Sequence, residues 1–326
     1  MTAAPATGPA DVDRGRQLVG IGILLVVTAI WGTTFPLVKR LTDLLDPTEL
    51  LFLRFGVAGA VALPVLLRRR PDGAWWQAAA EFGFLGWLGY AAQTAGLAAT
   101  SAGRSAFITS LSVLGVPLLA ALAGRPPHRR VWPAVAVAVA GTFLLANDGG
   151  PPNRGDALTL ITAASYSVYI LRLELWVRRV SSARLMAAQT LGVLPFAAAA
   201  LLLSDPTHWP HVAGGQATLQ LGTVWPLLIA RWSQLPLSAW RDLVYLGTVG
   251  LGLTAGLQAL GQARVAAAQA ALIFTTEPVW AALFAGLWLG ERLGPRGLGG
   301  GLLILLGAWL GQGLRLRDLL PGGRSG

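Results

Sequence analysis

"TAIWGTTFPLVKRL", residues 28–41, closes the first long apolar stretch of this chain. From Leu18 to Val38 no residue carries a charge, and about twenty apolar residues is the length at which a helix crosses a bilayer. Inside that length, however, Gly32 loosens the backbone and Pro36 removes a helix hydrogen bond. We therefore expect a membrane helix that is broken or softened just past its middle.

The composition of the whole chain indicates an integral membrane protein. Its 326 residues are 54% hydrophobic and only 12% charged, whereas a typical soluble domain is about 25% charged. A soluble fold would have to bury nearly every helix in one core. The first stretch is too long for a signal peptide and lacks a small-residue cleavage site, so we interpret it as a retained helix within the lipid bilayer.

Ten apolar segments are long enough to cross a membrane, and short polar connections join most of them. The exception is 204–239, which holds four prolines. Its apolar part, with Trp225 and Trp232, favours an interfacial segment, and an eleventh span is the alternative. The predicted spans are 18–38, 48–67, 79–99, 104–123, 131–146, 156–177, 184–203, 240–260, 267–288 and 296–314.

Basic residues predict the orientation. With the N-terminus in the cytoplasm, 15 Lys and Arg residues fall inside and 8 outside. The positive-inside rule then predicts a multi-pass protein of the cell membrane with two cytoplasmic tails, 1–17 and 315–326. Anchoring of this kind accounts for the net charge of +10. Nucleic-acid binding is not expected, because no basic stretch is interleaved with aromatic residues on a soluble module.

The sequence lacks the residues that most membrane enzymes use. It has no cysteine, and its three histidines, His128, His208 and His211, all fall in predicted loops. Phosphate-binding loops, nucleophile elbows and zinc-protease motifs are absent as well. We therefore expect no catalytic residues, no metal site and no cofactor, and we predict that the protein is not an enzyme.

The chain repeats itself. A shift of 134 residues overlays 28–41 on "TAASYSVYILRLEL", residues 162–175, and brings Arg54 beside Gln189. "PLLAAL" at 117–122 similarly matches "PVWAAL" at 278–283. Five spans followed by five spans must place the second copy upside down in the membrane. Inverted repeats around a site at the midplane are the construction of secondary transporters.

Several stretches resemble the EamA-type permeases of the drug/metabolite transporter superfamily, over about residues 20–315. They are "IWGTTFPLVKRL", "LLFLRFGVAGA", "TSAGRSAFITSLSVLGVPLLAAL" and "AALIFTTEPVWAALFAGLWLGERLGPRGLGGGLLILLGAWL". The resemblance implies an all-α fold of ten transmembrane helices in two inverted five-helix repeats, usually exporting small metabolites. We assign the repeats to 18–146 and 156–314, the second with the extended loop 204–239, which departs from the family pattern.

In a transporter fold of this kind, the presence of Gly32 and Pro36 within the first span has an explanation. Softened helices are tolerated where backbone groups meet protein partners or a water-filled cavity. We therefore predict that the stretch from Trp31 to Pro36 lines such a cavity, with Trp31 stacking on a substrate or on a closing gate. The alternative is that Trp31 is an aromatic packing residue and that Gly32 is a contact point between helices.

Other polar and aromatic residues lie at matching depths. Tyr166 and Tyr169 are three residues apart and share one helical face, as do Tyr90 and Gln93. Such groups must be satisfied by one another, by water or by a substrate. Their alternative role is contact between helices, worth about 0.6 kcal/mol each. The predicted substrate-binding residues are Trp31, Thr33, Thr34, Tyr90, Gln93, Tyr166, Tyr169, Gln258 and Gln262.

Few charges fall within the spans. Glu81, Arg172 and Glu174 are near span ends and are expected to reach the interface. Arg54 is an intramembrane charge about two turns below the outer surface. Glu277 stands near the centre of its span, and it is either a proton-coupling residue or a structural acid hydrogen-bonded to a threonine or a neighbouring helix.

These features predict a secondary-active transporter that works by alternating access around a midplane cavity. Its substrates are expected to be amino acids, related metabolites or drug-like amphiphiles, and export is the expected direction. A passive facilitator of the same fold is the first alternative, and a membrane enzyme or receptor is the second. The sequence is compatible with a monomer or a homodimer.

Overall fold

The computed structural model describes residues 9–68, 70–146, 151–204, 221–289 and 294–312. Within these ranges the chain is all-helical, and no strand is present among the described residues. The predicted C-terminal tail, 315–326, lies outside them. Much of the predicted N-terminal tail is helical, because the first helix already begins at Pro9.

The first half of the chain forms six helices. Asp72 and Ser101 begin two of them as N-caps, each accepting a hydrogen bond from the backbone N–H three residues on. A single residue, Leu111, separates the fourth helix from the fifth, so the predicted span 104–123 is a pair of short helices. The six are α1 (Pro9–Leu41), α2 (Pro47–Arg68), α3 (Gly73–Ala99), α4 (Ala102–Ser110), α5 (Ser112–Leu122) and α6 (Val131–Ala146).

The predicted spans of the second half of the chain are interrupted more often than those of the first half. Gly192 interrupts one predicted span, Thr275 and Thr276 interrupt another, and a π-helical stretch interrupts a third. The elements are α7 (Arg154–Trp176), α8 (Ser182–Leu191), α9 (Val193–Leu203), α10 (Leu221–Ser233), α11 (Leu237–Gly247), η2 (Thr248–Leu253), α12 (Thr254–Gln262), α13 (Ala267–Phe274), α14 (Glu277–Leu289) and α15 (Pro295–Gln312).

Length and apolar composition make this a membrane fold. Within the described chain, seven helical segments are long and apolar enough to cross a bilayer, and Val131–Leu144 is a shorter apolar helix. Large apolar side chains face outward around the bundle, among them Leu67, Leu122, Leu203 and Leu302, which are 69–86% exposed. In a membrane these side chains contact lipid. The seven segments are Arg14–Leu41, Pro47–Arg68, Arg104–Leu122, Arg154–Trp176, Ser182–Leu203, Leu237–Gln262 and Ala267–Phe284.

The expected break in the first helix is wrong, because α1 runs uninterrupted from Pro9 to Leu41 with Pro36 inside it. Gly32 is a contact point between helices. A Cβ added there would lie 2.7 Å from the Cβ of Trp280 and 2.9 Å from the backbone nitrogen of Ala281, both on α14. The glycine is therefore explained by close approach of α1 to α14 rather than by a bend in α1.

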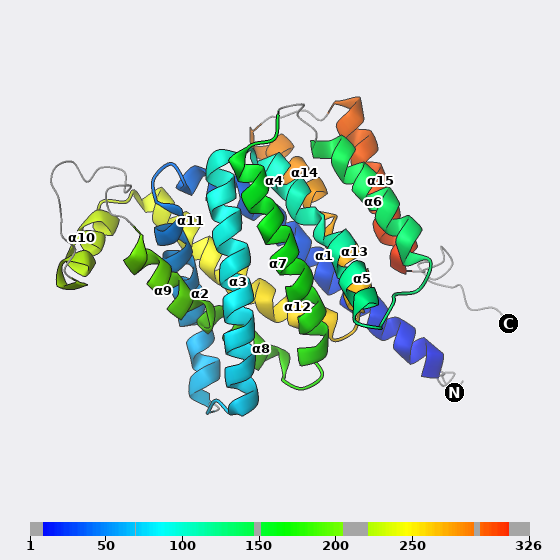
Figure 1. The fold of residues 1–326 in the computed structure, drawn as a ribbon, viewed down its shortest axis with the longest axis horizontal. Helices are drawn as coiled ribbons and strands as arrows, with labels where there is room; N and C mark the ends of the chain where they lie inside the picture. The colour runs from blue at the N-terminus through cyan, green and yellow to red at the C-terminus, as the bar shows by residue number, and fades with distance from the viewer. Residues whose placement is uncertain (1–8, 69, 147–150, 205–220, 290–293, 313–326) are drawn as a thin grey trace, which may run out of the picture.

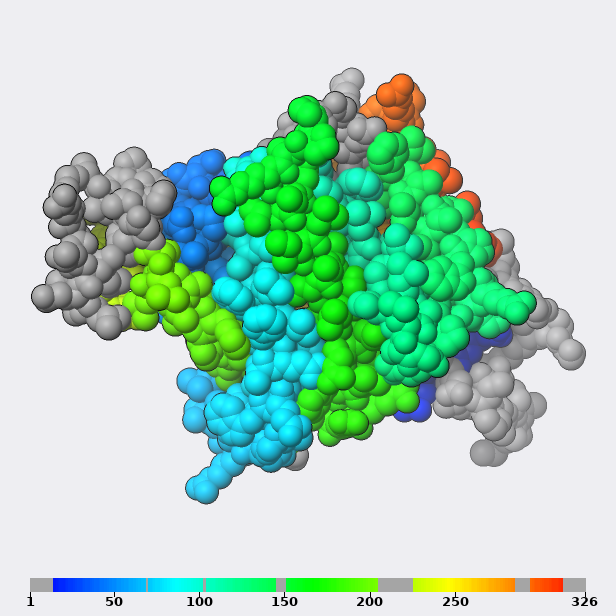
Figure 2. All heavy atoms as spheres, viewed as in Figure 1, coloured from blue at the N-terminus to red at the C-terminus, as the bar shows by residue number. Residues whose placement is uncertain are grey.

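The helices pack side by side in two conspicuous pairs, α3 with α7 and α6 with α15 (Figure 1). Figure 2 shows the side chains of α3 and α7 meeting in one continuous surface on this face. Small residues allow the second pair to approach closely, since a Cβ on Gly307 would lie 2.8 Å from the backbone of Ala134 and of Ala138.

Helix α10 occupies part of the predicted loop 204–239 and lies at the edge of the bundle beside α9 and α11 (Figure 1). Leu228 packs on Leu201 of α9. The buried carboxylate of Glu49, at the start of α2, pairs with Arg231 at 3.2 Å and accepts a hydrogen bond from the indole of Trp232 at 3.3 Å. These contacts attach α10 to the beginning of α2.

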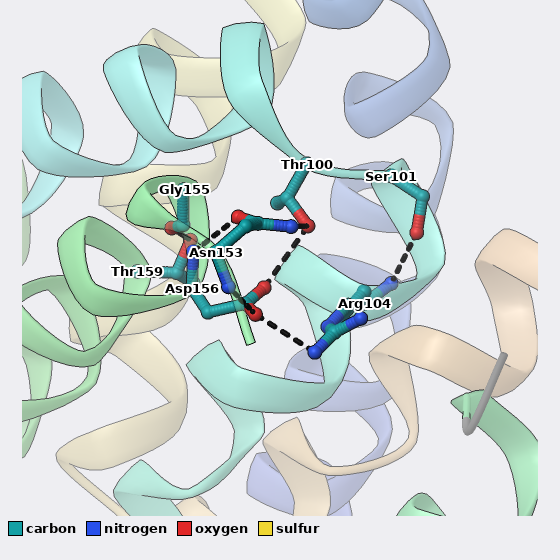
Figure 3. Close-up of polar contacts among 7 residues, drawn as sticks. All are labelled: Thr100, Ser101, Arg104, Asn153, Gly155, Asp156 and Thr159. Atoms are coloured by element: carbon teal, nitrogen blue, oxygen red, sulfur yellow. Dashed lines mark hydrogen bonds and ion pairs between the residues drawn. The ribbon is translucent and has the colours of Figure 1, made fainter. Parts of the chain in front are cut away.

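A polar cluster ties together the ends of α3, α4 and α7 (Figure 3). Asp156 accepts a hydrogen bond from the Thr100 hydroxyl at 3.0 Å and pairs with Arg104 at 2.8 Å. Its carboxylate also accepts from the backbone of Asn153, whose side chain accepts in turn from the backbone of Asp156. This capping box fixes the start of α7 against the neighbouring helices. We call Thr100, Arg104, Asn153 and Asp156 the α3–α4–α7 cluster.

Candidate functional site

A cavity of about 60 Å³ lies in the centre of the bundle. That is room for a few water molecules. Elements from both halves of the chain surround it, and its walls mix aromatic, hydroxyl, amide and charged side chains. The lining residues are Trp31, Thr34, Phe35, Arg54, Tyr90, Gln93, Thr109, Ser110, Ser112, Tyr166, Tyr169, Ile170, Gly250, Gln258, Phe274 and Glu277.

Trp31 forms the wall contributed by α1. Its indole nitrogen donates a hydrogen bond to the Thr254 hydroxyl at 3.2 Å, and its ring lies 5.3 Å from that of Phe274. Thr34 lines the same wall and donates to the carbonyl of Trp31 at 2.8 Å. The α1 wall is thereby linked to α12 and α13 of the second half.

Three tyrosines form another part of the cavity lining. The ring of Tyr90 on α3 meets that of Tyr166 on α7 at 5.5 Å, and Tyr166 meets Tyr169 at 6.4 Å, both edge to face. The Tyr169 hydroxyl donates to the side-chain oxygen of Gln189. The Tyr166 hydroxyl is buried and has no partner within the described residues. A donor and acceptor group is therefore left free at this wall.

Two predicted residues do not line the cavity. Thr33 donates to the carbonyl of Ile30 at 2.7 Å and shares a 2.7 Å hydrogen bond with the Tyr245 hydroxyl. Gln262 accepts from Gln258 at 3.1 Å and donates to the carbonyl of Ile170 at 3.0 Å. Both are engaged in contacts between helices, which was the alternative role. The other seven, Trp31, Thr34, Tyr90, Gln93, Tyr166, Tyr169 and Gln258, come together at the cavity.

The sequence analysis missed Thr109, Ser110 and Ser112, which line the cavity around the break between α4 and α5. Thr109 lies 3.5 Å from the side-chain nitrogen of Gln93. The signal was present in "ITSLS", three hydroxyls in five residues of an otherwise apolar span. Gln189 was also missed as a site residue, and it lines a second cavity of about 20 Å³ beside Tyr169.

Arg54, on α2, lines the central cavity of about 60 Å³ and is only 2% exposed. Its guanidinium carbon lies 5.6 Å from the centre of the Tyr90 ring, a cation–π contact. Its Nε and Nη1 atoms have no hydrogen-bond partner among the described residues. The structure thus holds a buried arginine that is only partly satisfied.

Glu277 begins α14, directly after the break formed by Thr275 and Thr276. Both threonine hydroxyls donate to carbonyls of the preceding helix turn, and Thr276 also shares a 3.0 Å hydrogen bond with Thr28. Within the described residues Glu277 has no hydrogen bond or ion pair, so the expected bonds to these threonines are not formed.

The remaining charges of the spans lie outside the cavity. Arg172 pairs with Glu81, donating from Nη2 at 2.7 Å, and Trp176 donates to the same carboxylate at 3.1 Å. Glu81 and Arg172 thus form an ion pair with each other, and their expected reach to the membrane interface stays a prediction. No group of three or more acidic or histidine side chains in the described part of the chain is placed to hold a metal ion.

A profile of the EamA-like transporter family matches residues 18–147 and 212–311, which is most of the chain. The matched ranges contain the cavity residues of α1 to α5 and of η2 to α14 but not those of α7. The chain belongs to the EamA-like transporter family. It is therefore a multi-pass membrane protein of a transporter family, and this agrees with the outward apolar side chains and the polar interior described above.

Two further comparisons found similar proteins. An uncharacterized transporter from Archaeoglobus fulgidus is 33% identical over 156 residues. That match spans 48% of each protein, so it covers about half the length of the relative. A solved crystal structure, described only as that of a protein, superimposes with a TM-score of 0.66 at 20% identity. It covers 91% of this chain and 96% of its own, and it shows likeness of fold alone.

Proposed function

We propose that this EamA-like protein is a secondary-active transporter that exports small organic solutes by alternating access around the central cavity. Amino acids and related metabolites are the proposed substrates, with drug-like amphiphiles as a wider set. The observation that carries the proposal is the mixed polar and aromatic cavity, which both halves of the chain build inside an apolar bundle. Polar groups in a membrane interior are expensive and mark transport pathways.

For the topology we propose ten transmembrane units in two inverted repeats, 18–146 and 156–314, with both termini in the cytoplasm of the cell. The fourth unit of each half is broken near its middle, after Ser110 in one and after Phe274 in the other, which supports the repeat. The ten units are α1, α2, α3, α4–α5, α6, α7, α8–α9, α11–α12, α13–α14 and α15. Helix α10 stays outside this count.

We propose that seven residues bind substrate: Trp31, Thr34, Tyr90, Gln93, Tyr166, Tyr169 and Gln258. The cavity of about 60 Å³ is smaller than most metabolites, so binding requires the walls to move apart. The helices are interrupted beside Ser112, Thr276 and Gly250, and these interruptions are the places where such movement would occur.

Proton coupling is the proposed role of Glu277. Two observations favour it over a structural role: the cavity position and the absence of a hydrogen bond to Thr275 or Thr276. A carboxyl group without fixed partners can take up and release a proton as the cavity opens to each side in turn. A passive facilitator remains the alternative function, and it needs no such group.

The test is uptake into proteoliposomes of the twenty amino acids, measured with and without an imposed proton gradient. Secondary-active transport predicts accumulation above equilibrium for at least one of them only when the gradient is present. Equilibration without accumulation would instead identify a facilitator. A protein that moves no solute under either condition would contradict transport and revive the enzyme or receptor hypothesis.

A further inference from the structure

Arg54 is a buried cation without an anion. Burying a charge is costly unless it is paired and hydrogen-bonded. Several acidic side chains that could pair with Arg54 instead form ion pairs with other arginines. Glu81, Asp156 and Asp242 pair with Arg172, Arg104 and Arg40, respectively. Among the described residues no carboxylate lies within 4.0 Å of Arg54, so its charge is not neutralised by the protein.

The surroundings of Arg54 satisfy only part of its guanidinium. The Tyr90 ring stabilises the positive charge through its face but offers no acceptor in the plane of the N–H groups. Nε and Nη1 are unpartnered, and both belong to a side chain that is 98% buried and lines the cavity. Buried donors of this kind, which line a cavity, are arranged for an acceptor that arrives from elsewhere.

A second unpartnered group lies on the next ring. The Tyr166 hydroxyl is buried without a partner, and the ring of Tyr166 lies 5.5 Å from that of Tyr90, over which Arg54 is placed. An arginine and a phenol on adjacent sides of one cavity present hydrogen-bond donors to the same space. A negatively charged oxygen pair in that space would satisfy both residues together.

We propose that Arg54 and Tyr166 bind the carboxylate group of the transported solute. The inference rests on the proposed transport function and names the chemistry of the substrate within it. A carboxylate matches the planar guanidinium fork, and charge-assisted hydrogen bonds of this kind are about twice as strong as neutral ones. The apolar remainder of the solute would lie against Phe35, Ile170 and Phe274, which line the same cavity.

Glu277 narrows the choice of anion. It lines the same cavity as Arg54 without pairing with it among the described residues. When Glu277 is ionised, it repels a doubly charged phosphate more strongly than a singly charged carboxylate. The carboxylate can come from a zwitterionic amino acid, whose ammonium group would face Glu277, or from a simple monocarboxylic acid. The experiment separates these two sources.

Binding is measured first, by the thermal stabilisation of the purified full-length protein in detergent. Three probes share one phenyl ring: L-phenylalanine, L-phenylalaninamide, which lacks the carboxylate, and 3-phenylpropanoate, which lacks the ammonium group. The expected result for the unmodified protein is affinity for at least one carboxylate-bearing probe that is about tenfold or more above that for the amide. Amino-acid substrates predict that L-phenylalanine also binds more tightly than 3-phenylpropanoate.

Three variants assign the effect to the site. Arg54→Gln should weaken carboxylate binding by about 10- to 100-fold, and Tyr166→Phe, which removes only the hydroxyl, by roughly three- to tenfold. Arg54→Lys should retain part of the affinity, because it keeps the charge but not the fork. Arg125→Gln, the same change at an exposed position in the turn before α6, is the matched control and should bind as the unmodified protein does.

The inference is overturned if the unmodified protein binds the amide as tightly as the acids, a comparison that needs no variant to fold. It is overturned equally if Arg54→Gln binds the carboxylates unchanged, or if no carboxylate probe binds. The same probes are then followed across proteoliposome membranes. If flux does not depend on the carboxylate group, the carboxylate site is rejected and the transport function is retained. If the probes bind in a way that depends on Arg54 but are not transported, the transport function is rejected and the carboxylate site is retained.

Discussion

At the scale of single residues, the shape of the cavity depends on where side chains are missing as much as on where they are present. Gly89 on α3 lies directly under the Tyr166 ring, so that a Cβ added there would be 2.4 Å from Cε1 of that ring. Gly115 on α5 leaves comparable room for the hydroxyl of Ser167. Tyr166 can therefore lean toward α3 only because residue 89 has no side chain.

Gly89→Ala is predicted to displace Tyr166 from this position. Overpacking of this kind costs about 1–3 kcal/mol, and the ring has to move out of the space that the methyl group takes. Transport and carboxylate binding should each fall by about tenfold, since a shift of 1 Å at a binding group can cost far more than that. Proteoliposome flux and thermal stability measure the two effects.

Gly22→Ala is the matched control, because nothing lies within 4 Å of a Cβ at that position of α1. It should leave flux unchanged. Normal flux in Gly89→Ala would mean that Tyr166 does not need its present position.

Glu277→Gln distinguishes the two roles of that acid. Glutamine keeps the shape and the hydrogen-bonding capacity but cannot ionise. Proton coupling predicts that gradient-driven accumulation falls to the equilibrium level, while exchange of substrate across the membrane survives. A structural role predicts that both change together or that neither changes. Accumulation and counterflow in proteoliposomes measure the difference, and fully proton-driven accumulation in the variant would exclude Glu277 as the coupling residue.

At the scale of helices, sequence patterns predicted which segments are helical but not where they are interrupted. Helical spacing identified shared faces such as Tyr166 with Tyr169. It did not predict that Thr33 and Thr34, about 100° apart on one helix, face different neighbours. The break at Gly192 depends on close approach to the other half of the chain, since a Cβ there would lie 2.2 Å from the carbonyl oxygen of Ala79 on α3. Such contacts are invisible in a local pattern.

The α3–α4–α7 cluster is predicted to hold three helix ends together through one carboxylate. Asp156→Asn removes the ion pair with Arg104 and weakens the capping box, and Asp156 is only 7% exposed. Loss of a largely buried charged partner should destabilise the protein by about 2–4 kcal/mol. Thermal unfolding in detergent measures the effect as a lowered midpoint.

Arg178→Gln provides a comparison at a weaker pair. Its partner Glu174 lies 3.7 Å away, and the Arg178 side chain is 75% exposed, so removal should cost no more than about 0.5 kcal/mol. Equal losses in the two variants would contradict the special role of the cluster.

The start of α3 offers a test of pH dependence. The hydrogen bond from Arg184 to the side chain of Asp72, and then that from the backbone N–H of Trp75, hold the pKa of Asp72 below its ordinary value. A lowered pKa in the folded state stabilises the protein above the unfolded-state pKa, and this contribution is lost as the pH falls through the folded value. Asparagine keeps the cap but not the charge.

Unfolding midpoints of the unmodified protein and of Asp72→Asn should therefore differ slightly at pH 7, with the unmodified protein more stable. The gap should close as the medium becomes strongly acidic. A gap that is the same at every pH would show that the charge of Asp72 is not involved.

At the scale of the whole molecule, the distribution of polar and apolar side chains is the reverse of that in a soluble protein. Leucines such as Leu122 and Leu203 are outside, while Arg54 and Gln258 are inside. Composition and span length predicted this arrangement, because both depend on the solvent rather than on particular contacts. The sequence alone could not predict that Glu81 pairs with Arg172 and Glu49 with Arg231, since each pair joins residues at least ninety positions apart.

The predicted topology places both ends of the chain in the cytoplasm. Epitope tags added before residue 1 and after residue 326 should be protected from a membrane-impermeant label in intact cells and should react after the cells are permeabilised. The physical reason is the excess of basic residues in the connections on that side. Labelling of one tag only in intact cells would contradict an even number of spans.

The unbroken course of α1 has a mechanical consequence. Its 33 residues make a rod about 50 Å long, more than the roughly 30 Å of a bilayer core, so part of it projects or the whole of it tilts. Neighbouring units α4–α5, α11–α12 and α13–α14 are each interrupted, whereas α1 is continuous. It therefore behaves as a lever pivoted where Gly32 touches α14. A rotation of about 10° about that point moves the Pro9 end by roughly 6 Å and the Leu41 end by roughly 2 Å in the opposite direction, so movement at one end of the helix is coupled to movement at the other.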